Sequence, residues 1–153
     1  MKVYTDPGNP QALKFIIASD IIGQKVNVII VCRGDCYVTL KLKNNLPTVE
    51  TGNNQFVDVK TAVRGLVQNP DDKWKKWIDW ETSKIQPAVL ELVVARDSKQ
   101  GADYSGLLKE LNQAEDVLKS HRHLSDSPSA DIIDACVWSS LFPVFLNETT
   151  ALE

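Results

Sequence analysis

The run from Trp77 to Val89 constrains the fold of this chain more than any other segment. Its apolar residues recur at helical spacing. Trp77 and Trp80 stand three residues apart, which places their rings on neighbouring ridges of one helix face. Pro87 falls inside the same pattern. Because proline has no backbone N–H, it predicts a kink or an interruption of the helix at that point.

Composition narrows the class of protein. The 153 residues suffice for one domain and little more, and 43% of them are hydrophobic, which supports a packed core rather than disorder. A net charge of −3 gives no reason to expect a nucleic-acid partner. Three cysteines without a signal peptide indicate a reduced, intracellular protein, and apolar runs such as 28–31 are too short to span a bilayer. We therefore expect a cytoplasmic protein.

The first part of the chain mixes strand and helix patterns. Residues 1–4 predict a short strand. Asn9 as N-cap and Pro10 as first residue predict a helix that stops at Gly23. The β-branched run 26–32 has no helical period and predicts a buried strand. Strand, helix and strand in this order indicate a βαβ unit with a parallel pair.

A hairpin and a helix follow. The segment 46–50 predicts a strand opened by Pro47, and the turn residues 52–54 predict antiparallel pairing with 55–57. Asp58 then predicts the N-cap of a helix.

Beyond an Asn-Pro-Asp-Asp linker at 69–72 the patterns are all helical. They cover residues 74–96, 107–118 and about 131–146. We therefore expect an α/β subdomain over 1–69, which resembles the thioredoxin fold, and an all-α subdomain over 70–153.

A βαβ–ββα half followed by an all-helical half resembles the glutathione transferase fold. Leu46-Pro47 resembles that family's proline-opened strand, in which the proline is usually cis. The match is closer to one branch, the transferase-like N-terminal domain of eukaryotic cytosolic methionyl-tRNA synthetases, and it covers the whole chain. The segments that carry it are Trp77-Ile78-Asp79-Trp80-Glu81, Ile85-Gln86-Pro87-Ala88 and Trp138-Ser139-Ser140-Leu141-Phe142-Pro143. Related domains of other synthetases, of elongation factor one gamma and of scaffold subunits remain alternatives.

The resemblance also implies a capping box at the start of the last helix. The register from tryptophan to proline places that box at Asp131 and Asp134, whereas a register three residues earlier would start at Pro128, which has no capping side chain. The family's helical half usually continues for two more helices. We therefore expect the chain to be a fragment of a longer protein, truncated at its C-terminal helices.

A working transferase needs two features. The first is a hydroxyl or thiol after the first strand, and the resemblance places Asn9 there, although Tyr4 and Thr5 remain possible donors. The second is a Glu/Gln-Ser pair opening the third helix, where this chain has Val59-Lys60. We therefore expect no glutathione chemistry, no catalytic residue and no cofactor.

Two further clusters favour ordinary structure. Cys32 and Cys36 lack Cys-x-x-Cys spacing, and His121 and His123 add no recognisable ligand pattern, so no metal site is expected. The segment 36–43 remains ambiguous, because it alternates like a strand without clear turn signals.

A lysine-rich and tryptophan-rich segment at 73–77 could stack bases, but the acidic residues around it favour a solvated helix start, so direct tRNA binding is not expected. The chain has no signature of aminoacyl transfer, even if its parent protein is a methionine-tRNA ligase.

The resemblance implies a non-catalytic domain that docks methionyl-tRNA synthetase into a multi-synthetase assembly, as a heterodimer with a partner of the same fold. Transferase folds dimerise across the third and fourth helices. The exposed side of those helices offers candidate contacts, although each could be ordinary surface: Lys60, Thr61, Arg64, Gln68, Trp74, Lys75 and Asp79. The alternatives are a glutathione-dependent transferase and a free-standing scaffold subunit or elongation-factor domain.

Overall fold

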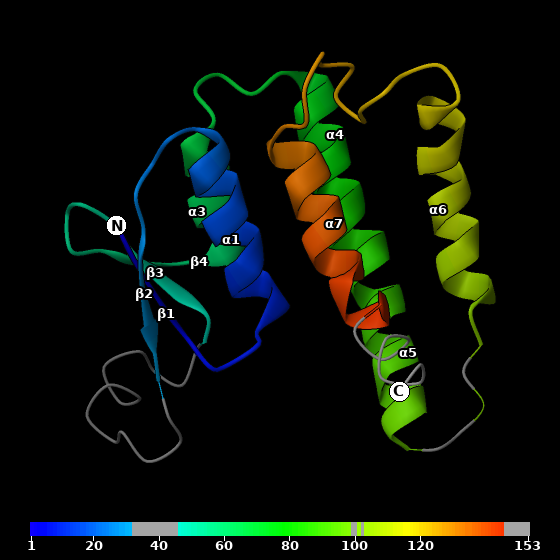
Figure 1. Cartoon of the computed structure of the whole chain (residues 1–153), viewed down its shortest axis with the longest axis horizontal. Coiled ribbons are helices and arrows are strands. Elements are labelled where there is room, and N and C mark those ends of the chain that lie inside the picture. The colour runs from blue at the N-terminus through cyan, green and yellow to red at the C-terminus, as the bar shows by residue number, and fades with distance from the viewer. Residues whose placement is uncertain (32–45, 99–100, 102, 146–153) are drawn as a thin grey trace. The chain divides into compact units, whose positions relative to one another are not determined.

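The computed structural model describes residues 1–31, 46–98, 101 and 103–145, and it divides the chain into two compact units, Met1–Pro70 and Asp71–Glu153 (Figure 1). The first unit contains a sheet and helices, and the elements of the second are helical throughout its described residues. The predicted fold class, an α/β half followed by an all-α half, is confirmed. The ambiguous segment 36–43, with Cys32, lies outside the described residues.

Among the described residues of the first unit, the sheet has four strands in the order β2-β1-β3-β4. β1 pairs in parallel with β2 and antiparallel with β3, and β3 pairs antiparallel with β4. The predicted βαβ unit and hairpin are therefore both present. The strands are β1 (Lys2–Thr5), β2 (Asn27–Ile30), β3 (Thr48–Glu50) and β4 (Phe56–Asp58).

The expectation that β2 is a buried strand is wrong. Val28 is 46% exposed and Ile30 is 50% exposed, because β2 lies at an edge of the sheet formed by the described strands. Their partners on the central strand, Val3 and Thr5, are buried. An apolar, β-branched run fixes the type of element, but it does not distinguish an edge strand from a central one.

Two helices pack together in the first unit. In α1 (Pro10–Ile21), the side chain of Asn9 accepts a hydrogen bond from the backbone N–H of Gln11 at 2.9 Å. Gly23 follows with φ of +70°, a conformation open to glycine, so the predicted stop is present. In α3 (Val59–Leu66), Asp58 is the N-cap. The core between helices and sheet contains Val3, Phe15, Ala18, Val49 and Val63.

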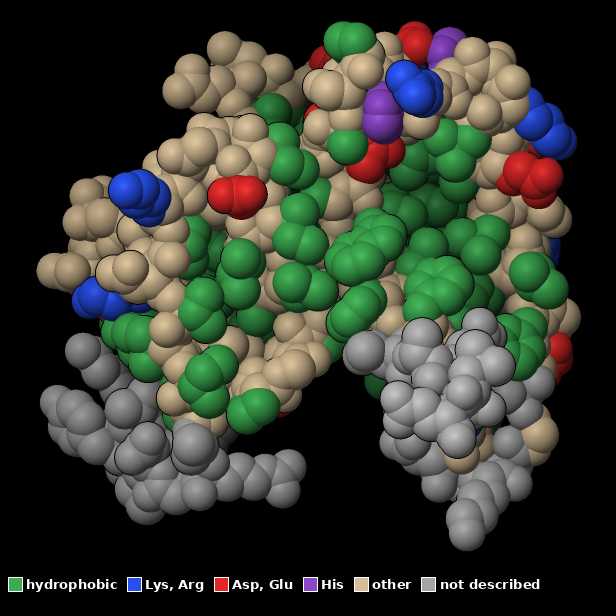
Figure 2. All heavy atoms as spheres, in the orientation of Figure 1, with side chains coloured by type: hydrophobic (Ala, Val, Ile, Leu, Met, Phe, Trp, Pro, Cys, Tyr) green, Lys and Arg blue, Asp and Glu red, His purple; other side chains and the backbone are tan. Residues whose placement is uncertain are grey.

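The second unit begins with a continuous helical stretch that runs from α4 through a π turn into α5. In the same unit, α7 packs along α5. Figure 2 shows hydrophobic side chains gathered over α7 and in the hollow between α7 and α6. None of the helices in the described part is both long and apolar enough to cross a membrane. The elements are α4 (Asp72–Trp80), a π turn (Glu81–Ile85), α5 (Gln86–Asp97), α6 (Ser105–Leu118) and α7 (Ile132–Phe145).

Pro87 does not end this stretch; the irregularity it predicts takes the form of the π turn. The backbone N–H of Gln86 donates to the carbonyl of Glu81, five residues earlier, which widens the helix just before the proline. This wider turn accommodates a ring that would clash with the carbonyl of residue 83 in a regular helix.

The tryptophans of α4 lie in the core of the second unit. Trp77 and Trp80 are 4% and 7% exposed, and their rings meet edge to face with centroids 5.0 Å apart. Farther along the stretch, Ile85, Val89 and Leu92 are also buried. The stripe read from the sequence is therefore the core-facing side of this helical stretch.

Candidate docking surface

The hydroxyl groups of Tyr4 and Thr5, at the end of β1, already have partners. Tyr4 Oη donates to Glu50 Oε2 at 2.6 Å, and Lys2 Nζ lies 3.2 Å from the same carboxylate. The hydrogen bond to Glu50, reinforced by burial and by the negative charge of Glu50, raises the pKa of Tyr4 above its usual 10.0. Thr5 is 4% exposed and its hydroxyl donates to the carbonyl of Asp6 at 3.0 Å.

Asn9, at the place of the serine in some transferases, is bound at both ends of its amide. Its Oδ1 caps α1, and its Nδ2 donates to Asp6 Oδ1 at 2.8 Å. The amide therefore holds the start of α1 in place. A thiolate there would have to displace the bond to Asp6 to obtain a donor.

The start of α3 offers an apolar side chain where the acid of a glutathione site would stand. Val59 is 6% exposed and belongs to the core. Asp58 uses both carboxylate oxygens locally, accepting from the backbone N–H of Thr61 at 2.9 Å and from its hydroxyl at 2.7 Å. The carboxylate of Asp58 is therefore engaged within the first turn of α3.

The side of α3 away from the core is polar. Thr61, Arg64 and Gln68 are exposed, and Lys60 is half-buried, whereas Val63 faces inward. Arg64 lies in the last turn of the helix, where a cation is favourable to the macrodipole. Four of the candidate contacts therefore lie on or directly after α3.

Two of the three candidates on α4 are also exposed. Lys75 makes an ion pair with Asp72 at 3.1 Å, and Asp79 is exposed. The expectation that Trp74 is exposed is wrong, since it is 7% exposed and extends the core stripe of Trp77. Its i, i+3 spacing to Trp77 was the signal for this burial.

The lysine-tryptophan segment of α4 does not form a stacking platform. Trp74 and Trp77 are buried, so their rings are covered. Lys73 lies 3.6 Å from Asp126, and Lys75 pairs within the helix. The arrangement agrees with a solvated helix start rather than a surface for bases.

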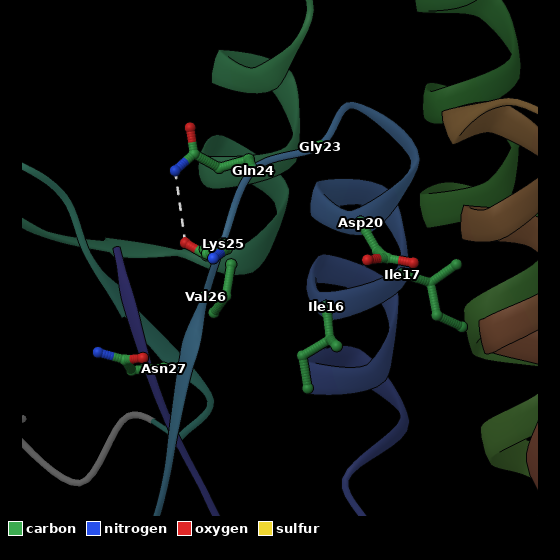
Figure 3. Close-up of a pocket in the computed structure, with 8 residues that line it drawn as sticks. All are labelled: Ile16, Ile17, Asp20, Gly23, Gln24, Lys25, Val26 and Asn27. Carbon is green, nitrogen blue, oxygen red and sulfur yellow. Dashed lines mark hydrogen bonds between the residues drawn. The ribbon is translucent and has the colours of Figure 1, made fainter.

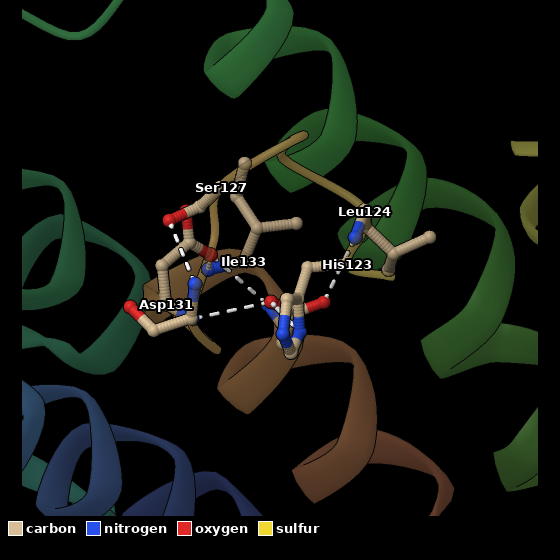
Figure 4. A network of polar contacts seen from close by, with 7 residues as sticks. His123, Leu124, Ser127, Asp131 and Ile133 are labelled. Carbon is tan, nitrogen blue, oxygen red and sulfur yellow. Dashed lines mark hydrogen bonds and ion pairs between the residues drawn. The ribbon is translucent and has the colours of Figure 1, made fainter. Parts of the chain in front are cut away.

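The start of α7 is held by a reciprocal pair of aspartates. Asp131 Oδ1 accepts from the backbone N–H groups of Ile133 and Asp134 at 2.8 and 3.4 Å, and Asp134 Oδ2 accepts from the N–H of Asp131 at 3.1 Å. Asp134 Oδ1 also accepts from the N–H of Leu124 at 3.0 Å, which ties the preceding loop to the helix (Figure 4). Ser127, which directly precedes Pro128 of the earlier register, accepts a hydrogen bond from the backbone N–H of Ser129 at 3.4 Å.

The histidines of that loop bind carboxylates. His121 Nδ1 pairs with Asp126, and His123 Nδ1 lies 3.5 Å from Asp134 Oδ2. Within the described residues there is no group of three or more residues placed to hold a metal ion.

The peptide bond between Leu46 and Pro47 is cis, as the family resemblance implies.

A surface pocket of about 540 Å³ lies between the end of α1 and the start of β2. Figure 3 shows Ile16 pointing toward the strand side, whereas Ile17 points away. Gln24 Nε2 donates to the carbonyl of Lys25 at 3.4 Å. The lining mixes apolar and charged groups without convergent donors, and it contains none of the candidate contacts.

Comparisons with known proteins agree with this geometry. No family model matches the chain. Glutathione S-transferase 1-6 from Anopheles dirus species B aligns with a TM-score of 0.80 at 14% identity, covering 97% of this chain and 80% of that chain. For glutathione S-transferase unclassified 2 from Bombyx mori the TM-score is 0.76 at 15% identity, covering 94% of this chain and 78% of that chain. The chain therefore has the glutathione transferase fold.

A comparison of sequences points to a more specific group of proteins. The cytoplasmic methionine–tRNA ligase of Xenopus laevis is 24% identical to this chain over 164 residues, a match that spans 100% of this chain and 18% of that protein. The resemblance to the transferase-like part of methionyl-tRNA synthetases, first indicated by the tryptophan and proline segments, is confirmed.

Proposed function

We propose that this chain is a non-catalytic docking domain of a cytoplasmic methionine-tRNA ligase, and that it binds a protein of the translation machinery with the same fold. The observation that carries this proposal is a transferase fold in which the polar groups near the first strand already form hydrogen bonds with other groups of the chain. Tyr4 donates to Glu50, Asn9 caps α1, and Val59 is buried. Together with the whole-chain similarity to a methionine–tRNA ligase, this favours a scaffold reused for binding.

The docking contacts that we propose lie on the exposed side of α3 in the first unit and, taken separately, at the start of α4 in the second unit. They would join the ligase to a multi-synthetase complex as a heterodimer. Stable interfaces of this kind bury roughly 1,200–2,000 Å² in total. The exposed contacts are polar and of mixed charge, which suits a specific partner. The residues proposed are Lys60, Thr61, Arg64, Gln68, Lys75 and Asp79.

The test is affinity capture from the native cytosol with the chain as bait, followed by mass spectrometry. The proposal expects enrichment of a protein that contains a transferase-like domain and belongs to the translation machinery. If the captured proteins are unrelated to translation, the proposal fails. If the chain captures translation proteins but its natural reading frame encodes no ligase, a free-standing scaffold subunit or elongation-factor domain is favoured instead.

The alternative from another class is a glutathione-dependent transferase, which the similarity to solved transferase structures keeps open. Titration calorimetry with millimolar glutathione separates the two. A docking domain gives no saturable heat, whereas saturation, or turnover of a standard electrophile, would establish the enzyme.

A further inference from the structure

The loop between α6 and α7 contains the one place in the sequence where a proline follows a hydroxyl residue, Ser127-Pro128. The other prolines follow aspartate, asparagine, leucine, glutamine or phenylalanine. A residue before proline is disfavoured in the helical region and takes an extended backbone. Protein kinases bind the acceptor serine of a substrate within an extended segment, and proline-directed kinases require proline directly after it. The dipeptide therefore has the local form that such a kinase recognises.

The loop leaves this serine reachable. Asp126, with φ of +67°, ends a turn in which its backbone N–H donates to the carbonyl of His123 at 3.2 Å. After the turn, residues 128–130 are exposed and Ser127 is half-buried. The hydroxyl of Ser127 accepts a long hydrogen bond of 3.4 Å from the N–H of Ser129, which Figure 4 draws in the network before α7. An exposed segment held this weakly opens at little cost.

The neighbouring serines each lack one of these two features. The hydroxyl oxygen of Ser125 is buried, and aspartate follows this residue in the sequence. Ser129 is exposed, but alanine follows it. Ser127 therefore combines a reachable hydroxyl with a following proline, and the serines on either side provide internal controls.

A lysine and a histidine already lie beside this position. Lys73 Nζ, at the start of α4, is 3.6 Å from Asp126 Oδ2, and His121 Nδ1 pairs with the other oxygen of the same carboxylate. Asp126 directly precedes Ser127. The side chain of Lys73 is 44% exposed, and an ammonium group has three N–H donors, so it can serve a second anion. A phosphate on Ser127 would bring a charge of about −1.5 to −2 to this group.

We infer that Ser127 is a phosphorylation site for a proline-directed serine/threonine kinase, and that Lys73 binds the phosphate. Ser127 Oγ forms a bond to the γ-phosphorus of ATP while the bond from that phosphorus to the leaving oxygen of ADP breaks. The hydroxyl proton passes to the catalytic aspartate of the kinase. The site contains none of the residues proposed to contact the partner, so this inference does not depend on the docking function.

Phosphopeptide mass spectrometry tests the acceptor on the full-length protein after incubation with ATP and a purified proline-directed kinase. The phosphate should be on Ser127, and the protein isolated from its native cytosol with phosphatases inhibited should carry it as well. Pro128→Ala keeps the hydroxyl but removes the proline, so modification should be lost, as in Ser127→Ala. Ser129→Ala is the matched control and should be modified like the wild type.

Four outcomes overturn the assignment of this site. They are a phosphate on Ser125 or Ser129 instead, modification that survives Pro128→Ala, modification of a synthetic peptide of residues 121–131 but not of the folded protein, and a protein from the cytosol without phosphate on Ser127.

The role of Lys73 has its own readout. Acylation of lysines by an amine-reactive reagent, read by mass spectrometry, is compared before and after phosphorylation. The reactivity of Lys73 should fall several-fold, because its ammonium group is then held by the phosphate. Lys119 is the reference, since it is 65% exposed and pairs with Asp116 within α6, and its reactivity should not change. Unchanged reactivity of Lys73 overturns its assignment as the phosphate's partner.

Discussion

The hydroxyl of Ser140 on α7 donates a hydrogen bond to the buried carboxyl group of Glu81 in the π turn. The two residues are 3% and 1% exposed and lie 59 positions apart in the sequence. Glu81 Oε1 also accepts from Gln86 Nε2 at 2.9 Å, and Thr82 donates to Oε2 at 3.3 Å. Buried polar groups that are well supplied with partners fix one arrangement of the helices around them.

Ser140→Ala should therefore destabilise the domain by about 1–3 kcal/mol, because it removes one hydrogen-bond donor from a buried acceptor. Urea unfolding followed by tryptophan fluorescence measures the loss. Ser83→Ala is the matched control, since that serine lies in the same π turn but is exposed and bonds only to the carbonyl of Asp79. It should change the free energy of unfolding by no more than about 0.5 kcal/mol. Equal effects of the two changes would contradict this role of Ser140.

Asp131→Ala should cost about 0.5–2 kcal/mol through loss of the α7 N-cap. Asp134→Ala should cost at least as much, because Asp134 accepts from the backbone of both Asp131 and Leu124. Ser127→Ala is the control and should be nearly silent. Equilibrium unfolding measures the free energy of unfolding of each variant. If Asp134→Ala leaves it unchanged and Ser127→Ala lowers it, the capping box lies in the register three residues earlier.

Much of this fold can be predicted from local patterns. Asn9-Pro10 and Gly23 give the limits of α1, and Pro47 with the turn at 52–54 gives the hairpin, because caps and turns depend on neighbours in the sequence. The position of β2 at the edge of the sheet could not be obtained in this way. It depends on strand order, which is a long-range property.

Glu81 was missed for a related reason. An acidic residue predicts a solvated position, and one of the hydrogen bonds that compensate for its burial comes from Ser140, on a helix distant in the sequence. The available signal was the spacing of Trp77, Glu81 and Ile85, since i, i+4 and i+8 put the glutamate in the core stripe. Trp74 was predicted to be exposed, but the core stripe that contains Trp77 extends one turn toward the start of α4 and includes Trp74.

Asp58 should contribute stability that depends on pH. Burial raises the pKa of its carboxyl group, but the hydrogen bonds from the backbone and hydroxyl of Thr61 outweigh burial and bring the pKa below its usual 3.8. Because the folded-state pKa is the lower one, the contribution is fully present above 3.8 and is lost as the pH falls through the folded-state pKa.

Asp58→Asn is the matched variant, because its amide oxygen still accepts a hydrogen bond but does not titrate in this range. The wild type should be more stable than Asp58→Asn at neutral pH, and the difference should disappear in strong acid. Thermal unfolding across the acid range measures this difference, and a constant difference at every pH would show that the carboxylate charge does not contribute. Asp58→Ala should cost about 0.5–2 kcal/mol at neutral pH.

Arg64→Glu should weaken binding to the partner captured from cytosol by at least about tenfold, because arginine is enriched among the residues that dominate interfaces and a reversed charge repels a complementary surface. Because Arg64 is exposed, the melting temperature of the domain should change by no more than about 2 °C. Lys109→Glu makes the same change of charge on the exposed side of α6 and should leave binding intact. Calorimetry or surface plasmon resonance with the purified partner measures both. If binding survives Arg64→Glu and is lost on Trp138→Glu, the partner contacts α7 rather than the α3 surface.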